Sequence, residues 1–192
     1  MADKKISDLT EVVTPATTDF FEITNAGASK KVSLANVKAT MVLGWQLIAA
    51  QVAAGATNYD FTGLAAYSSI EIVFDGVTLS SSGLAVVRVS TDNGATFLAA
   101  SGDYLGISGV GVSSNLTEIQ PYTTNATAAR YGVTTIQAFN VAGARKAART
   151  TFFSVDSRNI VVINTTAALN AVRVIATAGN LSGGTIGVFG RY

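Results

Sequence analysis

The chain has 192 residues, of which 48% are hydrophobic and only 13% are charged, and it contains no cysteine and no histidine. This composition excludes disulfides, thiolate metal sites, cysteine nucleophiles and histidine-containing triads. The net charge of +1 lacks the basic excess of a nucleic-acid-binding protein, and no apolar stretch of about 18 residues predicts a transmembrane helix. The N-terminal lysines precede no apolar run, so we expect no secretory signal. A surface with so few charges suggests that other subunits cover much of it.

The first 43 residues are richer in charge than the rest, and we expect them to form a small separate unit. Two short β-type runs, residues 19–24 and 30–34, flank a five-residue turn and predict a hairpin. Ser33 is placed to cap a short helix whose apolar face carries Leu34, Val37 and Met41. A unit of about 40 residues is too small to be stable alone, so we expect it to dock on another structure.

From Trp45 onward, short β-branched runs alternate with Gly, Ser, Asn and Asp. This pattern favours an all-β fold, an antiparallel β-sandwich of jelly-roll-like type, over βαβ units. We therefore divide the chain into an N-terminal anchor, residues 1–43, and a β-sandwich domain, residues 44–192. The stretch 102–132 is the least regular, and we expect it to be an exposed excursion or a subunit contact. The expected strands are residues 46–49, 69–74, 84–90, 96–99, 134–139, 150–154, 159–163, 171–176 and 185–189.

The sharpest local motif lies at residues 90–97 (STDNGATF), where Asp92, Asn93 and Gly94 predict a tight structural turn. The string resembles the Asp-box of sialidases, in which the carboxylate accepts N–H groups of its own turn. One copy without repeated blades favours a structural hairpin over a glycosidase site.

No pair of acids stands out as catalytic. A glycosidase needs two carboxyl groups about 5 to 9.5 Å apart, one with a raised pKa. We expect Glu22 and Glu71 to point from strands into solvent, and Asp60 and Asp75 to lie in turns. The sequence therefore predicts a non-enzymatic protein with no catalytic residue, no metal site and no cofactor.

Basic residues gather at 145–149 (RKAAR), which is either a contact for an acidic partner or, as we favour, a solvated loop or an interchain salt bridge. Arg88 and Arg173 lie inside apolar strands. Each either covers apolar surface with its stem on an outer face or pairs with an acid of a neighbouring subunit. Both alternatives remain open.

Three successive segments near the start carry a resemblance: residues 5–9 (KISDL), 14–19 (TPATTD) and 30–37 (KKVSLANV). Together they resemble a motif near the N-terminus of many tailed-bacteriophage virion proteins. Later features are similar to small phage β-domains, namely Trp45, residues 61–64 (FTGL), Tyr67, residues 88–94 (RVSTDNG) and residues 183–190 (GGTIGVFG).

The resemblance implies a virion structural protein, assembled in the host cytoplasm, with an N-terminal anchor, a β-sandwich and commonly a homotrimeric state. Two roles compete, a capsid decoration (cement) or head-fibre protein and a tail fibre or adhesin that binds a host receptor. The sequence has neither a heptad coiled coil nor a repetitive shaft, which favours the first role. A free carbohydrate-binding module is a more remote alternative.

In the virion reading, the anchor contacts the major capsid or connector protein. Apolar area would come from Ile6, Leu9, Phe20 and Phe21, with Lys30 and Lys31 as polar rim contacts. Several identical anchors would multiply weak contacts. A host cell-surface glycan could be bound by Tyr104, Tyr122 or Tyr131, although we favour packing of the 102–132 loop by these tyrosines. We expect no nucleic-acid partner and no membrane insertion.

Overall fold

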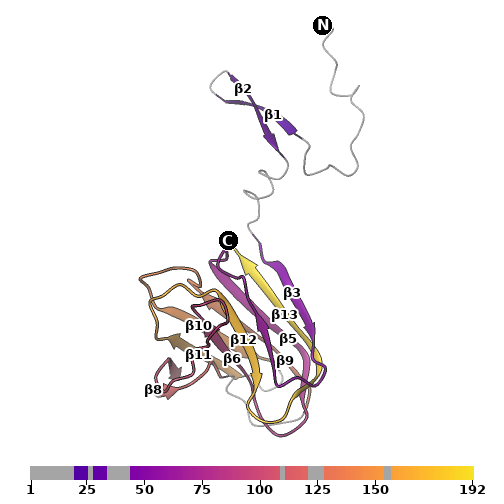
Figure 1. Ribbon diagram of the computed structural model, residues 1–192, viewed down its shortest axis with the longest axis vertical. Coiled ribbons are helices and arrows are strands. Elements are labelled where there is room, and N and C mark those ends of the chain that lie inside the picture. Colours follow the sequence, from indigo (N-terminus) through magenta and orange to yellow (C-terminus); the bar gives the residue numbers. More distant parts are fainter. Residues whose placement is uncertain (1–19, 26–27, 34–43, 109–110, 121–127, 154–156) are drawn as a thin grey trace. The chain divides into compact units, whose positions relative to one another are not determined.

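The structure, a computed structural model, describes residues 20–25, 28–33, 44–108, 111–120, 128–153 and 157–192 (Figure 1). The chain divides into two compact units, Met1–Leu43 and Gly44–Tyr192. The described residues are all-β, and every pair of neighbouring strands is antiparallel. No helix within these ranges has the length and apolar character needed to cross a membrane.

The first unit contains a hairpin of β1 (Phe20–Asn25) and β2 (Ala28–Ser33). The expected hairpin is confirmed, but its strands are longer on the turn side. Pairing continues as far as Asn25 opposite Ala28, which leaves less room than the five-residue turn we expected. The expected helix after Ser33 lies outside the described residues.

In the described part of the second unit, eight strands form a large sheet and three form a small sheet. The small sheet has the order β4 (Asn58–Phe61), β12 (Ala171–Ala176), β6 (Ala85–Ser90). The large sheet runs, from edge to edge, through β3 (Gln46–Val52), β13 (Leu181–Arg191), β5 (Ser69–Leu79), β9 (Arg130–Gln137), β10 (Lys146–Phe152), β11 (Ser157–Ile163), β7 (Tyr104–Ser108) and β8 (Gly111–Leu116).

Burial alternates along the strands because successive side chains point to opposite faces of a sheet. On β5, Ile70, Ile72 and Phe74 are buried, whereas Glu71 and Val73 on the other face are partly exposed. One hydrophobic cluster joins these residues to buried side chains of the small sheet, among them Val87, Val89, Val172 and Val174. Both sheets therefore contribute to the same core.

The strand predictions hold where β-branched residues alternate and fail where they do not. The expected strand at 96–99 is wrong, since this segment bonds to β6 through one main-chain contact, Leu98 N to Val89 O at 2.9 Å. The short strand β4 was not expected. Nor were β7 and β8, which occupy part of the supposedly irregular stretch 102–132. Their glycine and serine residues have low strand propensity, and pairing of β7 with β11 overrides it.

Candidate functional site

The outer sheet face is the side of the large sheet that points away from the core. One cross-strand row of this face follows the pairing register through seven strands, and we call it the central row. It consists of Leu47, Phe189, Glu71, Thr135, Arg149, Ile160 and Ile107, taken from β3 to β7. These residues are far apart in the chain, and only the long-range register brings them into line.

Large apolar side chains are exposed on this face. The exposed fractions are 59% for Leu47, 42% for Ile107, 39% for Ile160, 48% for Tyr131 and 69% for Phe153. A solvated face of an antiparallel sheet is normally polar, with the apolar residues confined to the opposite face. The outer sheet face therefore carries more apolar surface than a solvated sheet face usually does, with Leu47 near one edge of the sheet and Ile160 and Ile107 towards the other.

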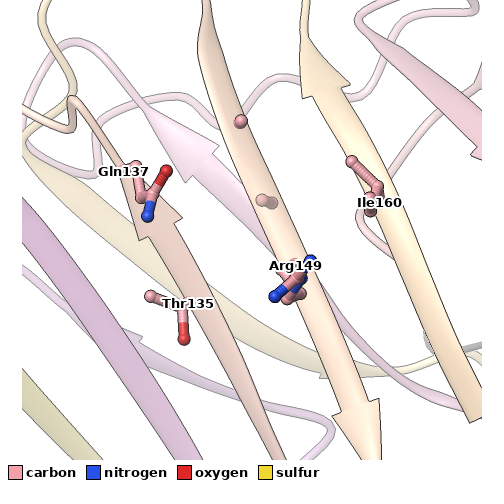
Figure 2. A pocket seen from close by; sticks show the side chains of 6 residues that line it. Thr135, Gln137, Arg149 and Ile160 are labelled. Atoms are coloured by element: carbon pink, nitrogen blue, oxygen red, sulfur yellow. The ribbon is translucent and has the colours of Figure 1, made fainter.

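A hollow of about 380 Å³ opens on this face above β9, β10 and β11, between the side chains of the central row and its neighbours. Figure 2 shows Thr135 and Gln137 on one strand, Arg149 on the next strand and Ile160 on the strand after that. The floor is formed at Ala147 and Ala148. Ala147 points to this face with a small side chain, whereas the side chain of Ala148 is buried on the core side. The hollow combines an amide, a hydroxyl and a guanidinium with an apolar wall, so it can receive a protruding side chain or a small polar group.

Two opposite charges of the central row, Glu71 and Arg149, have no ion-pair partner among the residues that the structure describes. Glu71 receives one long hydrogen bond, from Thr135 Oγ1 to its Oε2 at 3.5 Å. No ion pair or hydrogen bond joins the Arg149 side chain to any part of the chain that the structure describes. Glu71 and Arg149 are separated by Thr135, two strand spacings or about 10 Å at the backbone.

The outer face of the small sheet differs, because its charges are paired within the chain. Arg173 Nε and Nη2 donate to the two carboxylate oxygens of Asp60 at 2.6 and 2.7 Å, and its guanidinium lies 4.1 Å from the centre of the Phe97 ring. The hydrogen bond to Asp60 raises the pKa of Arg173. Arg88 Nη2 donates to Glu118 Oε2 at 3.1 Å.

Both acids belong to the same chain, which corrects the alternative that Arg88 and Arg173 pair with a neighbouring subunit. It also corrects the expectation that Asp60 lies in a turn, since Asp60 is in β4, and Asp75 likewise lies in β5. Burial raises the pKa of Glu118, but hydrogen bonds from Thr117, Gln120 and Arg88 outweigh it, and the net effect lowers the pKa.

Local hydrogen bonds stabilise the turn at Asp92, Asn93 and Gly94. Ser90 Oγ donates to Asp92 Oδ1 at 2.6 Å and accepts the Gly94 N–H at 2.9 Å. Asp92 also accepts hydrogen bonds from the main-chain N–H and the hydroxyl of Thr96. Hydrogen bonds from Ser90 and Thr96 lower the pKa of Asp92 to about 2. The φ angles of Asn93 and Gly94 are 59° and 90°, which suit asparagine and glycine. The carboxylate is occupied in holding its own turn.

The basic segment 145–149 is not a solvated loop, as we favoured from the sequence. Residues from Lys146 onward form β10, and Lys146 itself is buried. Its Nζ donates to the carbonyl oxygens of Ala144 and Ala167, and burial lowers the pKa of its ammonium group. Arg145 is exposed ahead of the strand, and Arg149 alone reaches the outer sheet face. The sequence cluster is therefore split between the core, a loop and the sheet surface.

Tyr104 is a core residue, and its proposed contact with a glycan is wrong. Its hydroxyl accepts the Val89 N–H at 3.0 Å and donates to the Leu98 carbonyl at 3.1 Å, while burial raises its pKa. Tyr131 is about half exposed on the outer sheet face. Tyr122 lies outside the described residues.

The predicted anchor residues are placed only in part. Ile6 and Leu9 lie outside the described residues. Phe20 and Phe21 are in β1, and Lys30 and Lys31 are in β2, so the register brings these four onto one hairpin. Their contact with a partner stays a prediction.

Sequence reasoning missed the central row, although one signal pointed to it. Residues 160–163 (IVVI) are apolar at four successive positions, which is typical of a strand covered on both faces. In the structure only Val161 and Ile163 are fully buried, and Ile160 is exposed on the outer sheet face.

Among the described residues, no group of three or more acidic side chains is placed to hold a metal ion. No protein-family model, no curated protein and no solved structure matches this chain.

Proposed function

We propose that the chain is a non-enzymatic bacteriophage virion structural protein, of the capsid decoration (cement) or head-fibre type. Residues 1–43 attach it to the capsid or connector, and residues 44–192 form a jelly-roll-like β-sandwich that is displayed outward. The observation that carries the proposal is the outer sheet face, a broad surface with exposed apolar side chains and open charges. A protein that works within an assembly needs such a surface.

Two further features support this reading. The chain divides after Leu43 into a small unit with a hairpin and a large unit with its own core, as an anchor followed by a displayed domain requires. The N-terminal segments also resemble the start of tailed-phage virion proteins. In a homotrimer, three anchors of weak affinity bind one particle together, which multiplies their individual affinities.

A tail fibre or adhesin is the second candidate, and the hollow on the outer sheet face favours it. Gln137, Thr135 and Arg149 offer hydrogen-bonding groups that a glycan hydroxyl or carboxylate could use. A free carbohydrate-binding module would use the same hollow without any particle. Binding on a glycan array by the isolated protein would favour these alternatives over a decoration role.

The test is incorporation into particles. In a host culture that produces the phage encoding this chain, particles are purified and examined by immunogold electron microscopy and mass spectrometry. We expect the full chain on the capsid, and we expect a variant lacking residues 1–43 to be absent from particles while remaining folded by circular dichroism. Absence of the full chain, or incorporation of the truncated chain at the normal level, contradicts the proposal.

A further inference from the structure

The charges of the outer sheet face are arranged so that the face fits a copy of itself. We propose that copies of this chain meet through this face, with Glu71 of one copy opposite Arg149 of the next. The inference rests on the self-association proposed above and assigns it to a surface.

The order of residues in the central row carries the argument. Thr135 of β9 stands in the middle, with Glu71 on one side and Arg149 on the other. A two-fold or three-fold axis running along β9 brings Glu71 of one copy towards Arg149 of the next. An axis across the strands would bring like charges together, which is unfavourable. The charge pattern therefore selects the direction of the symmetry axis.

The open state of both charges favours a second copy over a different partner. Arg88 and Arg173 are already paired with acids of their own chain, whereas Arg149 has no ion pair or hydrogen bond within the described residues. Within the same described ranges, Glu71 has only its long contact with Thr135. A partner with one sign of charge satisfies one of the two, whereas a copy presents both at the required spacing.

The size of the face is sufficient for a stable contact. From Leu47 to Ile107 the central row crosses six strand intervals, which is about 29 Å at the usual strand spacing. A standard interface buries roughly 800 Å² on each partner, a patch about 28 Å on a side. Exposed apolar residues lie at both ends of the row, so each end of one copy meets apolar surface on the next.

The test is charge reversal in the full-length protein, followed by light scattering over a dilution series. We expect the wild type to have a mass that is a multiple of 19.7 kDa. Glu71→Arg and Arg149→Glu each place like charges opposite one another and raise the dissociation constant about tenfold or more. The double variant restores opposite charges at every contact and brings the dissociation constant back to near the wild-type value.

Mixing the two single variants distinguishes a two-fold dimer from a three-fold ring. In a two-fold dimer with one copy of each variant, every 71–149 contact is again between opposite charges, so association is restored. In a three-fold ring, at least one contact remains between like charges, so restoration is incomplete. Either result supports the face, and the difference gives the number of copies.

Arg145→Glu is the matched control, because it makes the same charge change at an exposed residue that precedes β10. We expect its mass to equal that of the wild type, and circular dichroism confirms that all variants are folded. If the wild type is an oligomer and neither charge reversal weakens its association, the assignment to this face is overturned but self-association stands. A protein that stays monomeric at every concentration overturns self-association as well, and incorporation into particles then decides the virion proposal separately.

Discussion

The two sheets of the large unit differ in whether the charged side chains on their outer faces are paired. On the small sheet, Arg173 is held by both oxygens of Asp60, and Arg88 is held by Glu118. On the large sheet, Glu71 and Arg149 stand apart among exposed apolar side chains. The charges of the small sheet satisfy one another within the chain, whereas Glu71 and Arg149 are open to water or to a second molecule. This difference in charge pairing is the reason why we propose the outer sheet face, and not the small sheet, as the surface for self-association.

The largest expected effect is on the free energy of unfolding, and it distinguishes alanine substitutions at two neighbouring phenylalanines. Phe152 is 2% exposed and packs against Phe74 with a ring-centre distance of 5.4 Å, whereas Phe153 is 69% exposed. We expect Phe152→Ala to lower the free energy of unfolding by about 3 to 5 kcal/mol, because it leaves a cavity in the core. Urea titration of the dilute protein measures this loss.

Phe153→Ala is the matched variant, with the same truncation one position along the chain. We expect it to change the free energy of unfolding of the dilute protein by less than about 0.5 kcal/mol. Because it removes apolar area from the proposed interface, it should weaken self-association by about tenfold. An equal loss of folding stability in both variants would contradict the distinction between core and outer face.

A smaller loss is expected when the better-buried ion pair of the small sheet is broken. Glu118 is 7% exposed and receives hydrogen bonds from Arg88, Thr117 and Gln120. Glu118→Gln leaves the Arg88 guanidinium without its counter-charge, and we expect a loss of about 2 kcal/mol in the free energy of unfolding. Thermal unfolding followed by circular dichroism measures it, and an unchanged midpoint would show that the pair contributes nothing.

The pair of Asp60 and Arg173 is more exposed, with 34% and 29% of the two side chains accessible to solvent. We therefore expect Asp60→Asn to lower the free energy of unfolding by only about 0.5 to 1 kcal/mol, despite its two hydrogen bonds. Because salt screens such pairs, the difference from wild type should shrink in 1 M salt, where the screening length is about 3 Å. A difference that grows with salt would rule out an electrostatic origin.

The smallest of these effects is on the pH dependence of folding stability, through the turn at Asp92. The pKa of Asp92 is about 2 in the folded protein, below the value of about 3.9 expected when unfolded. A lowered pKa in the folded state stabilises the fold above the unfolded value, and this stabilisation is lost as the pH falls from about 4 towards 2. Asp92→Asn should therefore lose less stability than wild type over this window. Parallel slopes in thermal melts between pH 5 and pH 2 would contradict this.

Local patterns were enough to predict most strands, because their β-branched residues alternate. The side-chain hydrogen bonds of Asp92 could also be predicted, since their donors lie within four positions of Asp92 in the sequence. The charge pairs could not, because Asp60 and Arg173 are 113 positions apart. For the same reason the central row could not be predicted, since it depends on the register between strands distant in sequence. The segment around Lys146 was predicted to be a loop because the neighbouring arginines obscure the alternation of buried and exposed residues along the strand.

The most direct test of the central claim is a cross-link at the middle of the central row. The chain has no cysteine, so Thr135→Cys introduces a single thiol where the proposed axis passes closest to both copies. Sheets that pack face to face lie about 10 Å apart, so a bis-maleimide that spans about 8 Å can join the two thiols. Ser82→Cys, at an exposed residue between β5 and β6, is the control. We predict a covalent dimer for Thr135→Cys and none for the control. A Thr135→Cys protein that reacts with the reagent but stays at the mass of one chain would contradict the account.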